Sequence, residues 1–404
     1  MKSDAFISTK QLHFLLAKDT DRARTFYMLP KIHKPREKWP QRDMPEGRPI
    51  VSDYGSESYN VSKYIDSWIR PISIRHPSYL KDTYDFVSKI RGQKIPKNAL
   101  LVTGDVSALY TNMHIDRTLQ VTKSALAKYR DPQRPDKYIL RLLEITLRNN
   151  FTFNGEYFQQ ICGTAMGKSY APGLADLYLK EFDEKATNGY KIKPLFYYRF
   201  LDDIHFIWIG TTEELQEFET YLNSLISGIK ITLNYSYESV DFLDTTIYKT
   251  PDPSSDDHDT LCTCVFFKQT DTHQLLHKNS FHPRHTFTGV LKAQLLHFKR
   301  ISTSFADYNN ACSTLFAALQ KHNYSKSLLR KMKRDIWLSN NTTNPNDNTN
   351  AKHQKSVLPI VIPYNKIGIE LAHSWKSIIN QGQLFGEDSR LITAFCTGKT
   401  YTKN

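Results

Sequence analysis

The sequence is poor in cysteine and has no long apolar segment. Its 404 residues include five scattered cysteines: Cys162, Cys262, Cys264, Cys312 and Cys396. Their number and spacing exclude a disulfide framework and favour a reducing compartment. No apolar run approaches the roughly 20 residues of a membrane-spanning helix, and the start, Met1 to Asp4, lacks the apolar region of a signal peptide. We therefore expect a soluble cytosolic or nuclear protein, with two or three domains at this length.

Acidic residues are also in the minority. The chain has 41 Asp and Glu against 54 Lys and Arg, which leaves a net charge of +13. Between Val265 and Asn340 there are 12 basic and 3 acidic residues, so most of the excess lies in that segment. Such clustering favours a surface that follows a nucleic-acid backbone. The alternative interpretation is a solvated helical surface with no ligand.

Low-complexity sequence is almost absent. The one such stretch, SNNTTNPNDNTN from Ser339 to Asn350, predicts a flexible linker or loop near residues 340–356. A second break, TPDPSSDDHDT from Thr250 to Thr260, separates two β-type runs and predicts a long hairpin loop.

Apolar residues recur at intervals of three and four in several stretches, which indicates helices. From Thr286 onward the pattern is mostly helical, whereas strands and helices alternate before it. Thr211 and Glu214 offer one of these helices a capping box. The chain therefore predicts an α/β sheet domain followed by a basic helical domain. The apolar stripes are Ile139, Leu142, Leu143 and Leu147; Leu215, Phe218, Leu222 and Leu225; and Cys312, Leu315, Phe316 and Leu319.

An acidic pair lies at the centre of FYYRFLDDIHFIWI, residues 196–209. Runs rich in aromatic and branched residues flank Asp202 and Asp203, which predicts a β-hairpin with two carboxylates at its turn. Adjacent carboxylates repel each other, and a bound Mg²⁺ relieves that repulsion. Taken alone, the pair is more typical of an ordinary polar turn.

A third carboxylate, Asp105, follows the strand-like run from Ala99 to Thr103, which predicts that it lies at the end of a buried strand. Asp105 and Asp202 could then hold two Mg²⁺ ions about 4 Å apart, with Asp203 in support. One ion would activate a 3′ hydroxyl and the other would neutralise the leaving pyrophosphate. Tyr110 could place its ring beneath the sugar of an incoming nucleotide, where a 2′ hydroxyl would collide with it. The alternative is a core aromatic.

Seven segments, in order, resemble the motifs of reverse transcriptases, specifically those of Penelope-like retroelements, whose polymerase is akin to telomerase. Their order along residues 24 to 365 makes the resemblance specific, whereas a single motif would not. FYMLPKIHK (26–34) and RPIVS (48–52) resemble the fingers motifs, DVSALYTN (105–112) motif A, GTAMGKSYAPGLADLYL (163–179) motif B, FLDDI (200–204) motif C, FLDTTIYK (242–249) the primer grip and SFHPRHTFTGV (280–290) the start of the thumb.

The resemblance implies a mixed α/β (α+β) right-hand polymerase fold with antiparallel sheets and a mostly helical, basic thumb. It places the N-terminal segment and fingers at 1–97, the catalytic palm with fingers insertions at 98–264, the thumb at 265–338, a linker or loop at 339–356 and a C-terminal extension at 357–404. The implied activity is RNA-directed DNA synthesis from a DNA 3′ end. The implied partners are an RNA template, a DNA primer, their hybrid and dNTPs, with two Mg²⁺ ions, replaceable by Mn²⁺, and a nuclear location.

The resemblance also assigns residues to the dNTP. Lys31 and Arg48 would grip its triphosphate, Arg48 by a fork and Lys31 as a point charge. Gly163 and Gly167 would allow close approach to the base pair being formed, and Pro172 would enter the helix that follows. The implied dNTP set is Lys31, Arg48, Tyr110, Gln160, Met166 and Gly167.

A further set is expected to contact nucleic acid. Lys292, Lys299 and Arg300 could lie along phosphates together with the run at 331–334. Lys230 is a candidate proton donor to pyrophosphate. Zinc at Cys262, Cys264 and the nearby histidines fits poorly, because there is no CxxC knuckle. The predicted nucleic-acid contacts are Lys34, Phe242, Leu243, Asp244, His282, His285, Lys331, Lys333 and Arg334.

Two other functions are compatible with these motifs. A domesticated nucleic-acid-binding protein could keep the fold and lose synthesis, and a DNA-templated or template-independent nucleotidyl transferase uses the same metal chemistry. Intact Asp105, Asp202 and Asp203 favour an enzyme, because clustered acids repel a nucleic-acid ligand. Many Penelope-like proteins carry a GIY-YIG endonuclease, of which we find no signature after Val357. We therefore expect either a member without it or a truncated chain.

Overall fold

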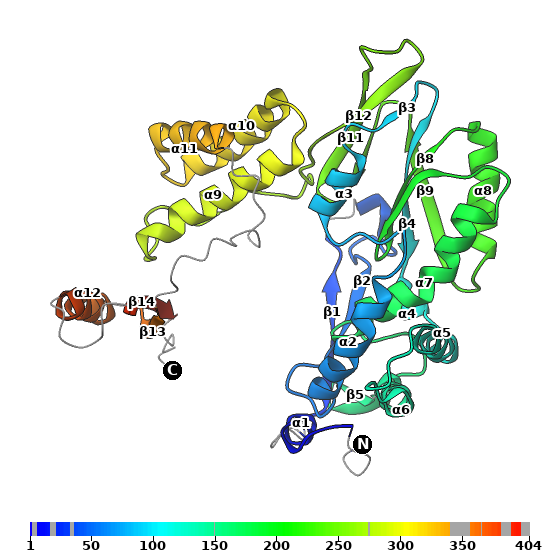
Figure 1. Ribbon diagram of the computed structural model, residues 1–404, viewed down its shortest axis with the longest axis horizontal. Coiled ribbons are helices and arrows are strands. Elements are labelled where there is room, and N and C mark those ends of the chain that lie inside the picture. The colour runs from blue at the N-terminus through cyan, green and yellow to red at the C-terminus, as the bar shows by residue number, and fades with distance from the viewer. Residues whose placement is uncertain are drawn as a thin grey trace. The chain divides into compact units, whose positions relative to one another are not determined.

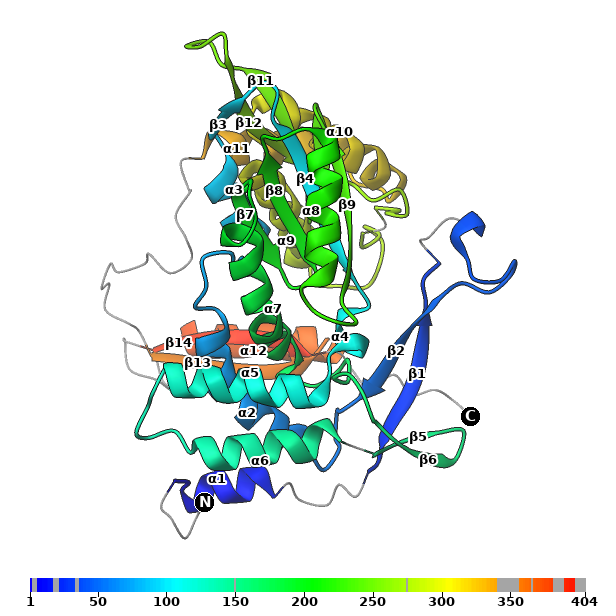
Figure 2. The same ribbon diagram turned by 90° about the vertical axis from the view of Figure 1, so that its right-hand side faces the viewer.

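The computed structural model describes residues 1, 6–16, 22–32, 36–148, 150–273, 275–339, 356–364, 366–380 and 389–396. The chain divides into two compact units (Figures 1 and 2). The first comprises Met1–Thr270 with Ile301–Asp307, and the second comprises Asp271–Arg300 with Tyr308–Asn404. Within these described ranges, no helix has the length and apolar character that crossing a membrane requires.

The first unit is built on a central antiparallel sheet with strand order β7-β8-β4-β9. The expected hairpin is confirmed, since β7 and β8 pair across the turn at residues 201 and 202. We expected Asp105 to follow the strand, but β4 continues two residues beyond it, because the ladder with β9 extends to Ser107. Asp105 therefore lies inside the strand rather than after it. The strands are β4 (Leu100–Ser107), β7 (Leu195–Phe200), β8 (Asp203–Trp208) and β9 (Lys230–Ser236).

The two faces of this sheet bury different cores, because successive side chains of a strand point to opposite faces. On one face, Val102 of β4 and Phe206 of β8 belong to a cluster with residues of five long helices and with Leu109 of a short one. On the other face, Leu101 and Ile207 pack with Phe86 and a second, smaller sheet. The five helices are α2 (Tyr59–Ser73), α5 (Ile115–Lys128), α6 (Asp136–Leu147), α7 (Ala171–Asn188) and α8 (Thr212–Ser224).

Two of these helices match the apolar stripes closely. α6 buries Ile139, Leu143 and Leu147, and α8 buries Leu215, Phe218 and Leu222. The predicted capping box is confirmed, because the Thr211 hydroxyl accepts from the Glu214 N–H and the Glu214 carboxylate accepts from the Thr211 N–H. Shorter helices are α1 (Thr9–Leu15), α3 (Thr83–Ile90), α4 (Leu109–Asn112) and a 3₁₀ turn at Arg36–Lys38.

Two further sheets complete the first unit. The smaller antiparallel sheet has the order β10-β11-β12-β3, and its β11–β12 hairpin confirms the loop expected between residues 250 and 260. The other has the order β2-β1-β5-β6 and carries both segments that resemble fingers motifs (Figure 2). The strands are β3 (Lys94–Pro96), β10 (Ser239–Phe242), β11 (Thr245–Pro251) and β12 (His258–Val265), and then β1 (Arg24–Pro30), β2 (Gly47–Ser52), β5 (Asn150–Phe153) and β6 (Glu156–Gln159).

The helices of the basic segment are confirmed. They are α9 (Arg284–Ile301), α10 (Phe305–Lys321) and α11 (Lys326–Leu338) (Figure 1). Of the stripe expected in α10, Cys312, Leu315 and Leu319 are buried. Farther along, β13 (Ser356–Pro363) and β14 (Ser389–Cys396) pair in parallel and are connected through α12 (Lys366–Asn380). The predicted linker, except for Ser339 and Ser356, falls outside the described residues.

Candidate active site

The central strands bring two of the predicted acids together. β4 and β8 are neighbours, and Asp105 is the register partner of Asp203. At the turn before β8, the Asp202 carbonyl accepts a hydrogen bond from the Val106 N–H at 2.9 Å. Leu201 in this turn has φ 56°, a left-handed conformation that leucine rarely adopts.

A cavity of about 630 Å³ opens at these acids. The central sheet contributes Asp105 and Asp202, and the fingers-like sheet contributes Arg48, with Lys31 immediately after β1. Six of the predicted site residues therefore line one space within the first unit. They are Lys31, Arg48, Asp105, Tyr110, Met166 and Asp202, accompanied by Glu46, Gly47, Pro49, Val106, Ala108, Leu109 and Thr111.

The acids of the site are electrostatically coupled. Burial raises the pKa of Asp202; its own N–H and Arg48 lower it, whereas Asp105 raises it further. Burial also raises the pKa of Asp203 to about 6, and Asp202 and Asp105 add to that rise. Burial, followed by the charge of Asp202, raises the pKa of the Tyr110 phenol well above its ordinary value. Uncompensated negative charge at this point favours a bound cation.

The two cations expected to bind the triphosphate differ in their surroundings. The Lys31 ammonium lies 2.9 Å from the Glu46 carboxylate, and the Lys31 N–H donates to the Glu46 carbonyl. Arg48 is close enough to Asp202 to lower its pKa. Glu46 was not predicted, and its position two residues before Arg48 was the only available signal.

The loop that resembles motif B connects the two sheets through its main chain. A Cβ atom on Gly163 would lie 2.6 Å from the Tyr110 carbonyl oxygen, and one on Gly167 would lie 2.7 Å from that of Val51. Both glycines also have positive φ. These glycines therefore permit a close approach of the protein's own backbone, and the approach to a base pair that we expected stays a prediction.

A buried ionic cluster supports the same loop. The Lys168 ammonium lies 2.9 Å from Asp53, which also accepts from the hydroxyls of Ser56, Ser58 and Ser62. Burial alone would raise the pKa of Asp53, but Lys168 and the hydroxyls of Ser62 and Ser58 keep it below its ordinary value. Burial lowers the pKa of Lys168 to about 8. The cluster joins the end of β2, which carries Arg48, to the loop that carries Met166.

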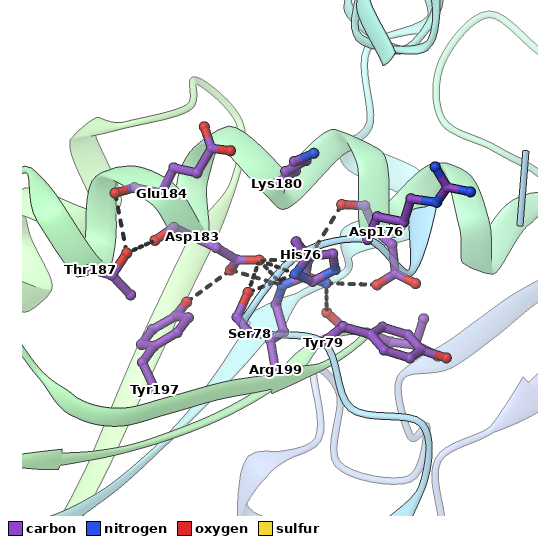
Figure 3. A network of polar contacts seen from close by, with 12 residues as sticks. His76, Ser78, Tyr79, Asp176, Lys180, Asp183, Glu184, Thr187, Tyr197 and Arg199 are labelled. Atoms are coloured by element: carbon purple, nitrogen blue, oxygen red, sulfur yellow. Dashed lines mark hydrogen bonds and ion pairs between the residues drawn. The ribbon is translucent and has the colours of Figure 1, made fainter. Parts of the chain in front are cut away.

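A second buried cluster lies behind the acidic turn (Figure 3). Arg199 of β7 pairs with Asp176 at 3.0 Å and with Asp183 at 2.8 Å, both on α7. Asp183 also accepts from the hydroxyls of Tyr197 and Ser78. Burial would lower the pKa of Arg199, but Asp183 and Asp176 outweigh it and raise that pKa. Charged residues inside otherwise apolar runs were the sequence signal for this cluster, and we did not predict it.

Other predicted residues of the first unit lie outside the cavity. Asp203 is not among the residues that line it. The half-buried Gln160 donates its amide to the Cys162 carbonyl at 3.0 Å. Pro172 lies in the first turn of α7, as expected. Lys230 is exposed at the first residue of β9, opposite Ser107, rather than in the preceding turn.

The segment that resembles the primer grip needs one correction. Phe242 is only 4% exposed and packs 4.7 Å from Phe86, ring centroid to ring centroid, so it is a core residue and cannot contact nucleic acid. Leu243 has φ 54° and packs against the same cluster. The Asp244 carboxylate accepts from the Thr83 hydroxyl at 3.2 Å.

The predicted contacts of the second unit divide into two groups. His282, His285, Lys331 and Arg334 are exposed. Lys333 instead donates to the Asn309 side chain, and the Lys299 ammonium donates to the carbonyls of Ile336, Trp337 and Ser339 at 2.6–3.0 Å. These two lysines hold helices together, which corrects our assignment of them to phosphates. Lys34 lies outside the described residues.

The donor set of the cavity limits which ion it suits. In the part of the chain that the structure describes, no group of three or more His, Cys, Asp or Glu residues is arranged to hold a metal ion. Two carboxylates do face one cavity. Mg²⁺ is commonly bound by one or two carboxylates together with water and substrate phosphates. The residues present therefore fit an Mg²⁺ site completed by a nucleotide.

Three comparisons with known proteins extend this description. A family model described as an animal helix-turn-helix domain matches residues 274–334, which include α9 and α10 and most of α11. No curated protein matches the chain. A solved telomerase from Candida albicans, in complex with a fragment of telomeric RNA, matches with a TM-score of 0.50 at 12% identity, over 80% of this chain and 59% of that one.

Other solved structures match less closely. An RNA-dependent RNA polymerase of a human picorbirnavirus gives a TM-score of 0.47 at 11% identity, over 76% of this chain and 56% of that one. A telomerase from Candida tropicalis gives 0.41 at 11% identity, over 58% of this chain and 55% of that one. The chain thus spans little more than half the length of these structures.

The chain has a right-hand polymerase fold. The likeness to the Candida albicans structure and the antiparallel sheets confirm the mixed α/β architecture of the expected fold, and its division into fingers, palm and thumb stays a prediction. At 12% identity this likeness concerns the fold alone.

Proposed function

We propose that this chain is an RNA-directed DNA polymerase, related to those of Penelope-like retroelements, which extends a DNA 3′ end on an RNA template. One observation carries the proposal. Both predicted cations and two of the three predicted acids line a single cavity, although their segments are separated by up to 171 positions in the sequence. A protein that only binds nucleic acid has no need for carboxylates that repel its ligand.

The cavity offers complementary groups for a nucleoside triphosphate. Arg48 presents a planar fork to phosphate oxygens, and Lys31 presents a point charge. Lys31 already pairs with Glu46, so phosphate binding would exchange or share that partner. Tyr110 follows Asp105 by five residues and lines the same space. Its ring is suited to excluding a 2′ hydroxyl, which would favour deoxynucleotides.

Asp105 and Asp202 would hold two Mg²⁺ ions, with Mn²⁺ as a substitute, and Asp203 would support them. When bound, these ions neutralise charge that develops on the attacking 3′ oxygen and the leaving pyrophosphate. The chain's own groups would orient the triphosphate and exclude water from the reacting atoms. Lys230 is exposed and outside the cavity, which leaves it a weak candidate for protonating pyrophosphate.

The three helices α9, α10 and α11 would bind the primer-template hybrid. Their family match is to a helix-turn-helix domain, a motif that lays a helix in a nucleic-acid groove. The exposed cations of α11 would contact phosphates. A nuclear location follows from a DNA primer as substrate.

Primer extension tests this proposal directly. The purified chain is mixed with a labelled DNA primer on an RNA template or on a DNA template of the same sequence, together with dNTPs and Mg²⁺. We expect extension on RNA, and none by Asp202→Asn on either template. Extension of DNA templates only, or untemplated addition, would identify another nucleotidyl transferase. Primer-template binding without any extension by the unmodified chain would identify a binding protein.

A further inference from the structure

The Arg199 side chain is fully buried, and all three of its nitrogen atoms are hydrogen-bonded (Figure 3). Nε lies 3.0 Å and Nη2 lies 2.8 Å from Asp183. Nη1 lies 3.0 Å from the Asp176 carboxylate and 2.9 Å from the main-chain carbonyl oxygen of Leu201. The last contact joins the cluster to the turn that carries Asp202.

Two peptide groups flank Asp202, and each is held by a hydrogen bond. The carbonyl before it, of Leu201, accepts from Arg199. The carbonyl after it, of Asp202 itself, accepts from Val106 at 2.9 Å. Because peptide groups are planar, their orientations set φ and ψ of the residue between them. Together the two bonds fix the direction in which the Asp202 side chain leaves the backbone.

The turn needs such support. Leu201 has φ 56°, and a side chain with a Cβ atom keeps this conformation only where surrounding contacts enforce it. Arg199 can supply that contact because α7 holds it in place. Asp176 and Asp183 are seven residues apart, which is two helical turns, so both face the guanidinium from one side of the helix.

We propose that Arg199 is a positioning residue for the metal centre of the proposed polymerase. By holding the Leu201 carbonyl, it orients Asp202 so that this carboxylate and that of Asp105 share one cation. The inference rests on the proposed function, and it concerns a residue that touches neither the cavity nor a nucleotide.

A matched pair of variants separates positioning from stability. Arg199→Lys keeps the buried charge but loses the fork, so one ammonium cannot serve Asp183, Asp176 and the Leu201 carbonyl in the same geometry. Tyr197 lies on the same strand as Arg199. Tyr197→Phe removes the hydroxyl that donates to Asp183 at 3.0 Å, and it leaves the contacts of the turn unchanged. Both variants perturb the buried Asp183, and only the first also loosens Asp176 and releases the peptide before Asp202.

Mn²⁺ binding, followed by electron paramagnetic resonance in the presence of dNTP, gives a readout that does not depend on turnover. We expect Arg199→Lys to weaken Mn²⁺ binding by about 10-fold or more, as is typical when a group behind a metal ligand is lost. The Mg²⁺ concentration for half-maximal extension should rise by a similar factor. Tyr197→Phe should leave both values within about twofold of the unmodified chain, even if both variants melt at lower temperature.

If Asp202→Asn abolishes Mn²⁺ binding, the acids hold the ion as proposed. Equal Mn²⁺ affinities in Arg199→Lys and Tyr197→Phe would then overturn the positioning role and leave the proposed function intact. Mn²⁺ binding that Asp202→Asn does not change would overturn both. If Arg199→Lys does not fold, Asp183→Asn replaces it, because an amide keeps the shape but takes away the anionic partner of Nε and Nη2, so the guanidinium no longer holds the Leu201 carbonyl in a fixed position. We expect the same loss of Mn²⁺ affinity there, and an unchanged affinity would contradict the proposal.

Discussion

Asp105 and Asp203 lie directly opposite each other across β4 and β8, yet Asp202 is the acid that shares the cavity with Asp105. The turn accounts for this difference. Asp203 is the first residue of β8 and follows the alternation of that strand, whereas Asp202 follows a left-handed residue, Leu201. Two adjacent acids of one motif are thereby placed in different surroundings.

This arrangement predicts unequal effects of removing the acids. Asp105→Asn and Asp202→Asn should each reduce primer extension on the order of 1000-fold or more, because the charge that would hold the ions is lost. Asp203→Asn should cost less, about 10- to 100-fold, as expected for a supporting group. Single-turnover extension measures the rates, and primer-template affinity, which should persist in all three variants, is the control. A larger defect in Asp203→Asn than in Asp202→Asn would show that the ligands are misassigned.

Sugar selection should depend on the Tyr110 ring. Tyr110→Ala removes the side chain beside Asp105 in the cavity, so ribonucleotides should be incorporated at least about tenfold more efficiently relative to deoxynucleotides. Tyr110→Phe keeps the ring and should keep the discrimination. Competition between a dNTP and its matching rNTP at one template position gives the ratio. Unchanged rejection of ribonucleotides in Tyr110→Ala would remove the steric role.

The basic helices should bind nucleic acid through α11 and not through the lysines that hold helices together. Arg330, Lys331 and Arg334 are exposed, and replacing all three by Gln should reduce the slope of log affinity against log salt by about 2 to 3. Products should also shorten, while single-nucleotide addition at saturating primer-template stays near normal. Lys299→Met is the contrasting variant, because its ammonium bonds three carbonyls at the end of α11. It should lower the melting temperature and leave the slope unchanged.

The ionic cluster beneath the motif B loop should be important for stability. Lys168→Met leaves the buried Asp53 without its nearest cation, which should cost about 3 to 5 kcal/mol of unfolding free energy. Asp53→Asn combined with Lys168→Met should cost less than the sum of the two single variants, since either substitution alone already breaks this ion pair. Denaturant titration of the single and double variants measures this difference. Additive losses would show that the two residues do not stabilise each other.

His205 predicts a pH dependence of a definite sign. Its ring is fully buried beside Phe86 and Phe242, and burial lowers its pKa from 6.5 to about 3. Below pH 6.5 the unfolded chain therefore binds a proton that the folded chain does not, so His205 makes the protein less stable as pH falls. His205→Phe removes this contribution.

The measurement for His205 is the difference in unfolding free energy between His205→Phe and the unmodified chain. That difference should grow in favour of the variant by about 2 kcal/mol between pH 7.5 and pH 5. Burial raises the pKa of Asp176 to about 6, so Asp176 contributes a pH dependence of the opposite sign. This contribution is the same in both chains and cancels in the difference between their unfolding free energies. A difference that does not vary with pH would show that the pKa of the ring is the same in the folded and unfolded chains.

Sequence patterns determined the local structure of this protein. Apolar spacing was sufficient to predict α6 and α8, and the Thr211 capping box predicted where α8 begins. Runs rich in aromatic residues predicted the hairpin at Asp202. These features depend on residues a few positions apart, whose contacts follow from helix and strand periodicity. The acids and cations of the candidate site were found by their resemblance to ordered motifs, because single charged residues carry no periodic signal.

Only the tertiary structure decided which polar residues contact one another. The partners of Arg199 on α7 are 16 and 23 residues away, and Lys168 reaches Asp53 across 115 residues. Burial decided that Phe242 is core and that Lys299 and Lys333 hold helices, although their sequence context was that of nucleic-acid contacts. A charged side chain inside a fold must find a compensating partner, and which partner lies within reach depends on how strands and helices pack.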